Sequence, residues 1–172
     1  DVPNLSTSLY FVVNDSFYKK ALPKVGLPEG VEVMSLKDAA DERPELVGKY
    51  YGKIAKTSED AVTALNTMLA EDGLFIHVGR NVKVDRAIQV VNILRSDVDL
   101  MVNRRVLIVV EQDAEARFLF CDHAADDRRF LATQVIEAYV GDNASLDLYC
   151  MEETHIRNTR TSNVFIEQQA NS

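Results

Sequence analysis

The sequence predicts a mainly β chain in which a β-solenoid follows a small N-terminal α/β segment. Three observations lead to this fold class: helical spacing gives way to period-2 alternation after Leu74, one short pattern recurs every 30 to 32 residues, and alternate residues of each copy are apolar. We therefore expect residues 1–72 to form the lead-in, with two or three short helices. Residues 73–172 should form a truncated solenoid of about three to four coils.

The lead-in begins with a strand and a turn. Residues 8–13 are β-branched and aromatic, which favours a strand, and residues 14–16 have turn chemistry. Two prolines and two glycines at 22–30 indicate a loop, and a short strand is expected at 31–34.

Three helical runs follow, at 36–41, 44–51 and 58–71. Ser35 with Asp38, and Thr57 with Asp60, have the spacing of capping boxes at the first and third runs. Pro44 suits the first turn of the second run.

The third run carries an apolar stripe that we expect to face the core, and Gly73 is expected near its C-cap. The stripe consists of Ala61, Val62, Leu65, Met68 and Leu69.

The repeat is Val-x-x-(Asn/Asp)-(Val/Ala)-x-apolar, and its copies begin at Val78, Val110 and Val140, spaced 32 and 30 residues apart. A weaker fourth copy is assigned to Ile166, 26 residues further on. Each copy has strands on both sides of a turn and no helix, which favours a β-solenoid. An antiparallel β-sandwich with a chance likeness of hairpins is the alternative. The sequence lacks the hexapeptide signature of left-handed acyltransferase helices, which argues against that type of solenoid.

The fourth copy reaches Ser172 within what we expect to be its second strand. Because a solenoid without a terminal cap has an open edge, we expect the chain to be a piece of a longer protein.

The faces of the strands follow from the register, because alternate residues of a strand point to opposite faces. Residues four, six, eight and ten steps after each first valine are apolar or Cys in eleven of twelve cases and should point inward. They are Val82, Val84, Arg86, Ile88, Ala114, Ala116, Phe118, Phe120, Ala144, Leu146, Leu148 and Cys150. Odd positions such as Lys83, Glu115, Arg117, Ser145 and Asp147 should face solvent.

The composition excludes several classes of protein. The net charge is −8 and the basic residues form no patch, so we expect no nucleic-acid partner. No run of about 18 apolar residues is present, so we expect no membrane span. The two cysteines have no CxxC spacing, and we expect reduced thiols in a cytoplasmic protein.

Short segments along nearly the whole chain resemble, in their order, the SufD branch of the SufB/SufD family of iron–sulfur cluster assembly proteins. The segments are VNDSF (13–17), LPEGV (27–31), SLKDA (35–39), YYGK (50–53), ALNT (64–67), DGLFI (72–76), IQV (88–90) and RRVLIVVE (104–111).

The resemblance implies a right-handed parallel β-helix and a non-catalytic scaffold in a complex of SufB-like and SufD-like subunits with a SufC-like ATPase. It also implies that an iron–sulfur cluster, and flavin, belong to the full complex, while this chain binds no cofactor. The family's working Cys and His residues and its SufC contact would lie beyond Ser172. We therefore assign no catalytic, cofactor or metal residue by resemblance, and we expect the protein in the cytoplasm.

Cys121 and His123 are the weak candidates for metal binding or sulfur relay, because two residues of a strand that are two apart share a face. Cys150 is expected to point inward, opposite to Cys121, so that the two thiols share no site. His155 is a nearby imidazole in the sequence, and His77 is expected at the surface.

The other charged candidates are expected at the surface. Asp126 and Asp127 suit a solvated acidic pair. The arginines expected as surface charge are Arg104, Arg105, Arg128 and Arg129.

Two functions outside the family remain as alternatives. A carbohydrate-active β-helix enzyme would need clustered carboxylates on one outer wall, and the outward positions show no such cluster. A surface adhesion solenoid is the other. A homodimer through solenoid edges is a further expectation.

Overall fold

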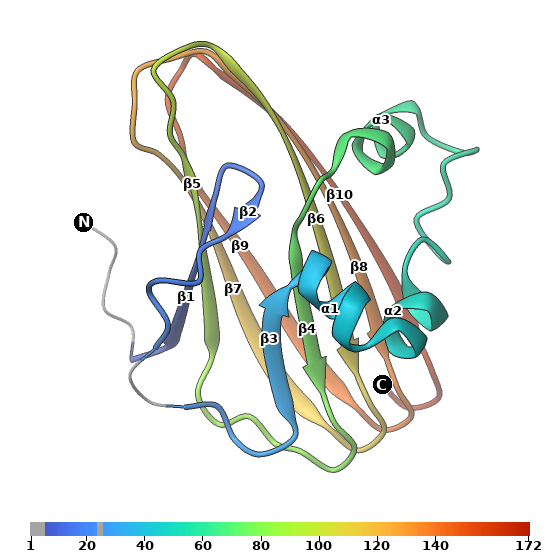
Figure 1. Ribbon diagram of the computed structural model, residues 1–172. Coiled ribbons are helices and arrows are strands. Elements are labelled where there is room, and N and C mark those ends of the chain that lie inside the picture. The colour runs from blue at the N-terminus through green and yellow to red at the C-terminus, as the bar shows by residue number, and fades with distance from the viewer. Residues whose placement is uncertain (1–5, 24–25) are drawn as a thin grey trace.

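The computed structural model describes residues 6–23 and 26–172, which form two facing five-stranded sheets with helices on one side (Figure 1). Sheet A contains, in spatial order, β2 (Ser16–Phe17), β1 (Ser8–Val13), β5 (Ile88–Leu94), β7 (Glu115–Ala124) and β9 (Ser145–Glu153). Sheet B contains β10 (Asn158–Gln168), β8 (Phe130–Val140), β6 (Leu100–Val110), β4 (Leu74–Val78) and β3 (Val31–Ser35).

Successive coils stack in parallel. The pairs β1–β5, β5–β7 and β7–β9 are parallel in sheet A, as are β4–β6, β6–β8 and β8–β10 in sheet B. Among the described residues, only the hairpin β1–β2 and the pair β3–β4 are antiparallel, and each includes a strand of the lead-in. The expected β-solenoid, of about three turns, is confirmed, and the antiparallel sandwich is wrong.

The strand pairing confirms the first three copies of the repeat and corrects the fourth. Val78 pairs with Val110, and Val110 pairs with Val140. Val140 pairs with Gln168, not with Ile166, so the fourth copy begins 28 residues after the third. Ser172 consequently lies after the turn that follows β10 and not inside a second strand.

The Asn or Asp of the pattern has a backbone reason. Asn81, Asp113, Asn143 and Asn171 have φ of 62°, 60°, 54° and 58°, a left-handed conformation that these two residue types tolerate best after glycine. The backbone amides of the first three each donate to a carbonyl of the next coil; that of Asn81, for example, donates to the Gln112 carbonyl at 3.0 Å.

The even positions of the repeat line the core between the sheets. Ala114 and Phe118 are fully buried there. In the first copy, Ile88 lies ten residues after Val78, but it pairs with Phe118, which lies only eight residues after Val110. The longer first spacing therefore places two extra residues after Val84, and Arg86, predicted to point inward, is exposed.

The three helices of the described chain cover the outer face of sheet B (Figure 1). They are α1 (Leu36–Glu42), α2 (Pro44–Tyr50) and α3 (Ala61–Leu69), close to the predicted ranges. A second apolar cluster, which includes Leu36, Val47, Phe75 and Leu107, joins α1 and α2 to the sheet.

Two predicted helix signals are corrected. The Ser35 side chain accepts from the Asp38 amide as expected, but α3 is capped by Asp60, whose carboxylate accepts from Thr63 N, and not by Thr57. Gly73 is no C-cap, since Ala70 holds that place. A Cβ on Gly73 would lie 2.0 Å from the Arg105 carbonyl oxygen, so a glycine is needed for this close approach to β6.

The orientation predicted for α3 is wrong. Its buried residues are Thr63 and Asn66, whereas Met68 is 72% exposed. The helix lies over polar residues of the outer face of sheet B, and its polar side faces them.

The division at residue 72/73 stays a prediction. Strands from the lead-in are part of both sheets, since β1 pairs with β5 and β3 with β4. Part of the predicted loop, residues 24 and 25, lies outside the described residues. No helix in the described ranges is long and apolar enough to cross a membrane.

Candidate functional site: a polar layer inside the solenoid

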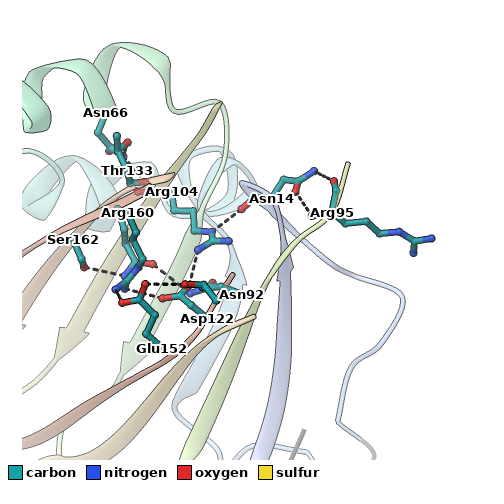
Figure 2. Close-up of polar contacts among 12 residues, drawn as sticks. Asn14, Asn66, Asn92, Arg95, Arg104, Asp122, Thr133, Glu152, Arg160 and Ser162 are labelled. Atoms are coloured by element: carbon teal, nitrogen blue, oxygen red, sulfur yellow. Dashed lines mark hydrogen bonds and ion pairs between the residues drawn. The ribbon is translucent and has the colours of Figure 1, made fainter. Parts of the chain in front are cut away.

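A layer of polar side chains interrupts the apolar interior of the solenoid (Figure 2). Apolar clusters lie on both sides of it along the strands: the main core on one side, and the cluster around Leu94 and Phe130 on the other. The layer consists of Asn92, Asp122 and Glu152, aligned across sheet A, and of Arg104, Gln134 and Ser162, aligned across sheet B, with Arg160 beside them.

Asp122 holds two arginines. Its Oδ1 lies 2.6 Å from Arg104 Nη1 and its Oδ2 lies 2.8 Å from Arg160 Nη2. The Arg104 and Asp122 side chains are only 2% and 3% exposed. Glu152 Oε2 adds a contact of 3.3 Å to Arg160 Nη1. Burial lowers the pKa of the Arg104 guanidinium, and the Asp122 carboxylate opposes that effect.

Amide side chains connect the sheets through the same layer. Asn92 Nδ2 donates to Gln134 Oε1 at 3.3 Å, and Gln134 Nε2 donates to Ser162 Oγ at 3.2 Å. Arg104 Nε donates to the Asn14 carbonyl at 2.7 Å. This hydrogen bond connects the turn between β1 and β2 with β6 in the interior of the solenoid (Figure 2).

A second buried ion pair lies on the opposite face of β6. Arg105 Nη2 is 2.6 Å from Glu137 Oε1, and both side chains are fully buried. Glu137 also accepts from the amides of Gly52 at 2.9 Å and Ala55 at 3.2 Å, which fixes the segment between α2 and α3. Arg105 Nη1 donates to Thr67 Oγ1 of α3 at 2.7 Å.

Of the four arginines predicted as surface charge, two are buried and two are exposed. Arg104 and Arg105 are buried, so the prediction is wrong for both. Arg128 and Arg129 are exposed, and Arg129 pairs with Asp99 at 2.7 Å. The physical reason is that β6 is covered on both faces, by sheet A and by the helices.

The two cysteines lie on opposite faces of sheet A, as their register predicts. Cys150 pairs with Phe120 on the interior face, and Cys121 pairs with Met151 on the outer face. Cys150 is nevertheless exposed, because β9 is the edge strand of sheet A among the described residues. Cys121 is half-buried and has Gln89 Nε2 at 3.5 Å.

Cys121 and His123 share the outer face of sheet A, two residues apart on β7. Within the described ranges, no group of three or more His, Cys, Asp or Glu residues could hold a metal ion. Partial burial raises the pKa of the Cys150 thiol, with Arg160 opposing it, and so favours the protonated thiol over the thiolate that binds metals. The candidate roles of Cys121 and His123 stay predictions.

The remaining predicted residues make local contacts. His155 Nδ1 lies 3.4 Å from the exposed Asp127, and Asp126 accepts from the Ser96 amide at 2.9 Å. His77 lies between Glu32, at 3.3 Å, and Glu111, at 3.0 Å, with its side chain 17% exposed, which is less than a surface position implies.

Sequence reasoning missed the polar layer, although the register carried a signal. Counted from the first valine of their copies, Asp122 and Glu152 are both at step 12, an even and therefore inward position. Arg104 and Gln134 both precede the next valine by six residues, again on the inward face. Charged residues at inward positions of neighbouring coils predict a buried ion-pair layer.

Chemically, the layer is an arrangement of ion pairs and hydrogen bonds that fix neighbouring coils to one another. Buried charges require partners, so any shift in strand register would leave the guanidinium groups unpaired. The polar layer therefore specifies how the coils align.

Comparison with known proteins gives two family matches that together span nearly the whole chain. Residues 1–90 match the SufBD protein N-terminal region, and residues 92–172 match the SufBD core domain of the SUF system for FeS cluster assembly. The junction between the matches lies within β5.

Three curated relatives show the range of similarity. The iron–sulfur cluster assembly protein SufD of Bacillus subtilis is 29% identical over 148 residues, which cover 85% of this chain and 34% of that protein. A SufBD family protein of Synechocystis is 29% identical over 119 residues, which cover 69% of this chain and 25% of that protein. A chloroplastic SufBD family protein of Arabidopsis thaliana is 27% identical over 130 residues, covering 75% and 22%. The aligned region is thus about a third or less of each relative's length.

Proposed function

This chain belongs to the SufBD family of iron–sulfur cluster assembly proteins, and we propose that it forms part of a non-catalytic scaffold subunit. In this proposal the subunit works in a complex with a SufB-like subunit and a SufC-like ATPase. The support for a scaffold comes from the interior of the solenoid, where charged groups are paired with one another and hold the coils in register.

We propose that edge strands of the solenoid take part in assembly with other subunits. Among the described residues, β9 and β10 are edge strands of sheets A and B, and each pairs on one side only. On β10, Val164 is 42% exposed and Ile166 is 51% exposed. An edge strand with apolar side chains favours the addition of further strands, either from another subunit or from a second copy in a homodimer.

The outer walls give no support to a carbohydrate-active enzyme. On sheet A, outward carboxylates are paired with bases, as in Lys83–Glu115 at 2.7 Å and Arg117–Asp147 at 3.9 Å, and on sheet B Glu32 and Glu111 both contact His77. Hydrolysis of a glycoside needs two carboxyl groups that face one bond.

We also propose that this chain itself binds no cofactor, so that the iron–sulfur cluster, and flavin where it is used, are held elsewhere in the complex. Anaerobic incubation with iron and sulfide tests this. We expect no visible absorbance beyond that of the Cys121→Ser variant, and a cluster spectrum that disappears in this variant would contradict the proposal.

The scaffold proposal is tested with the natural protein, tagged and co-expressed with the SufB-like and SufC-like proteins of the same organism. We expect a complex that survives size-exclusion chromatography and that loads clusters onto an acceptor faster than mixtures lacking the tagged subunit. Absence of both partners from the purified complex would overturn the proposal. Cell fractionation would test the cytoplasmic location that we propose with it.

A further inference from the structure

Helix α3 lies on the solenoid with its polar side inward. The residues that it buries are Thr63 and Asn66, and neither is exposed at all. A helix on the surface of a globular protein ordinarily buries its apolar stripe instead.

Specific hydrogen bonds fix this orientation. Asn66 Nδ2 donates to the Arg104 carbonyl at 2.9 Å and to Thr133 Oγ1 at 3.0 Å. At the other end of the helix, Asn163 Nδ2 donates to Asp60 Oδ2 at 2.7 Å and to Thr63 Oγ1 at 3.1 Å. Rotation of α3 would leave these buried groups without partners, at a cost of about 1–3 kcal/mol for each.

The apolar residues of α3 are therefore left on the side away from the sheet. Met68 is 72% exposed and Leu69 is 38% exposed, while Val62 and Leu65 are half-buried. With Ala61, these residues have the spacing i, i+1, i+4, i+7 and i+8, which is the pattern of a helix that packs along another helix.

Charge indicates what kind of helix would fit. The helix is flanked by Glu59 and Asp60 at its start and by Glu71 and Asp72 after its end, and residues 57–72 contain no Lys or Arg. Within the described residues, Glu59 pairs with Lys56 at 3.7 Å. Asp60 and Asp72 accept hydrogen bonds from neutral groups, such as Thr63 N and Ser35 Oγ, which leaves their negative charge in place. A second copy of α3 or an anionic lipid surface would meet like charges at both ends.

We propose that the exposed face of α3 (Ala61, Val62, Leu65, Met68 and Leu69) docks an amphipathic helix of a partner protein whose apolar stripe is flanked by lysine or arginine. The stripe supplies the contact area, and the basic flanks pair with the acidic ends of α3. This surface lies outside the polar layer and belongs to a different part of the fold.

The probe is a labelled synthetic peptide of about 18 residues, five helical turns, with leucines at helical spacing and lysines at its ends. Its binding to the natural protein is followed by fluorescence anisotropy. One control peptide has the same composition with the leucines scrambled, and the other has glutamates in place of the lysines. The variant is Met68→Asp, and the matched control is Ile156→Asp, since Ile156 is 96% exposed in a loop far from α3 in the sequence.

We expect the striped lysine peptide to bind about tenfold or more tightly than either control peptide. Met68→Asp should weaken binding about tenfold, with an unchanged melting temperature, and Ile156→Asp should have no effect. Equal binding of the scrambled peptide, no binding, or binding that ignores Met68→Asp would overturn the proposal. Two other results would also overturn it by assigning the surface to a different occupant: a concentration-dependent dimer, or binding to anionic vesicles, that Met68→Asp abolishes.

Discussion

Asp122 connects the buried guanidinium group of Arg104 with the partly exposed guanidinium group of Arg160. Its carboxylate oxygens are shared between Arg104 on β6 and Arg160 on β10, strands that are separated by β8 in sheet B. The favourable energy of such a pair is small once desolvation is included, but the loss of one partner leaves charge buried without compensation. Single substitutions in the layer should therefore be costly.

We expect Asp122→Asn to lower the free energy of unfolding by about 3–5 kcal/mol, because it keeps the shape of the side chain and removes the charge that both arginines need. Urea denaturation measures the change. Asp147→Asn is the matched control, since the Arg117–Asp147 pair at 3.9 Å is exposed, and it should change stability by about 0.5 kcal/mol or less. A similar small effect of both substitutions would show that Asp122 is not needed for stability.

Cys150 should behave as an unactivated thiol. Partial desolvation by its neighbours raises the pKa of the Cys150 thiol, so less of the reactive thiolate is present at neutral pH than in a free cysteine. In the Cys121→Ser variant, which has Cys150 as its single cysteine, alkylation by iodoacetamide at pH 7 should be slower than in an unstructured peptide and should rise at a higher pH. Adding Arg160→Ala should shift the rise in alkylation rate to a still higher pH, because Arg160 favours the thiolate. Faster alkylation than the peptide at pH 7 would contradict this prediction.

At the scale of elements, capping residues and turns determine where helices and strands end. In the solenoid turns, an Asn or Asp adopts positive φ at the same place in each copy. In the lead-in, the side chains of Ser35 and Asp60 accept hydrogen bonds from backbone amides in the first turns of α1 and α3. These positions explain much of the polar sequence pattern between the strands.

Asp60→Ala should destabilise the protein by about 1 kcal/mol, because the Thr63 amide loses its acceptor and Asn163 loses a partner. Thr57→Ala is the control, since Thr57 has the sequence signature of a cap but does not cap the helix. Thermal unfolding of both variants distinguishes the two assignments. If Thr57→Ala were the more harmful change, the cap would lie where the sequence pattern alone places it.

The sequence predicted the solenoid because its period and its inward positions depend on local alternation along each strand. It misplaced the fourth copy because Gln168 occupies the position of a valine, and only pairing with Val140 identifies it. It misplaced α3 because the polar outer face of sheet B, to which Thr133 and Asn163 contribute, is not visible in the helix's own sequence. The buried arginines were missed for a related reason: the burial of β6 on both faces arises from the tertiary arrangement.

At the scale of the whole molecule, β6 joins the two layers. Its neighbouring residues Arg104 and Arg105 point to opposite faces, one into the solenoid and one toward the helices. The interior pair fixes the coils, and the Arg105–Glu137 pair fixes the helical layer on sheet B. Changes in β6 should therefore affect both layers.

Stability within a stacked solenoid should depend on how many coils cover each strand. In a protein limited to these 172 residues, β6, β7 and β8 would have neighbours on both sides, whereas β9 and β10 would pair on one side and be largely exposed. Nearest-neighbour stacking then predicts local opening of the last coil at a lower free energy than global unfolding. Amide hydrogen exchange should be about tenfold or more faster, averaged over a strand, in β9 and β10 than in β6 to β8. Uniform protection across these strands would mean that the interior ion pairs, which connect Arg160 of β10 to Asp122 of β7, make all the coils unfold together.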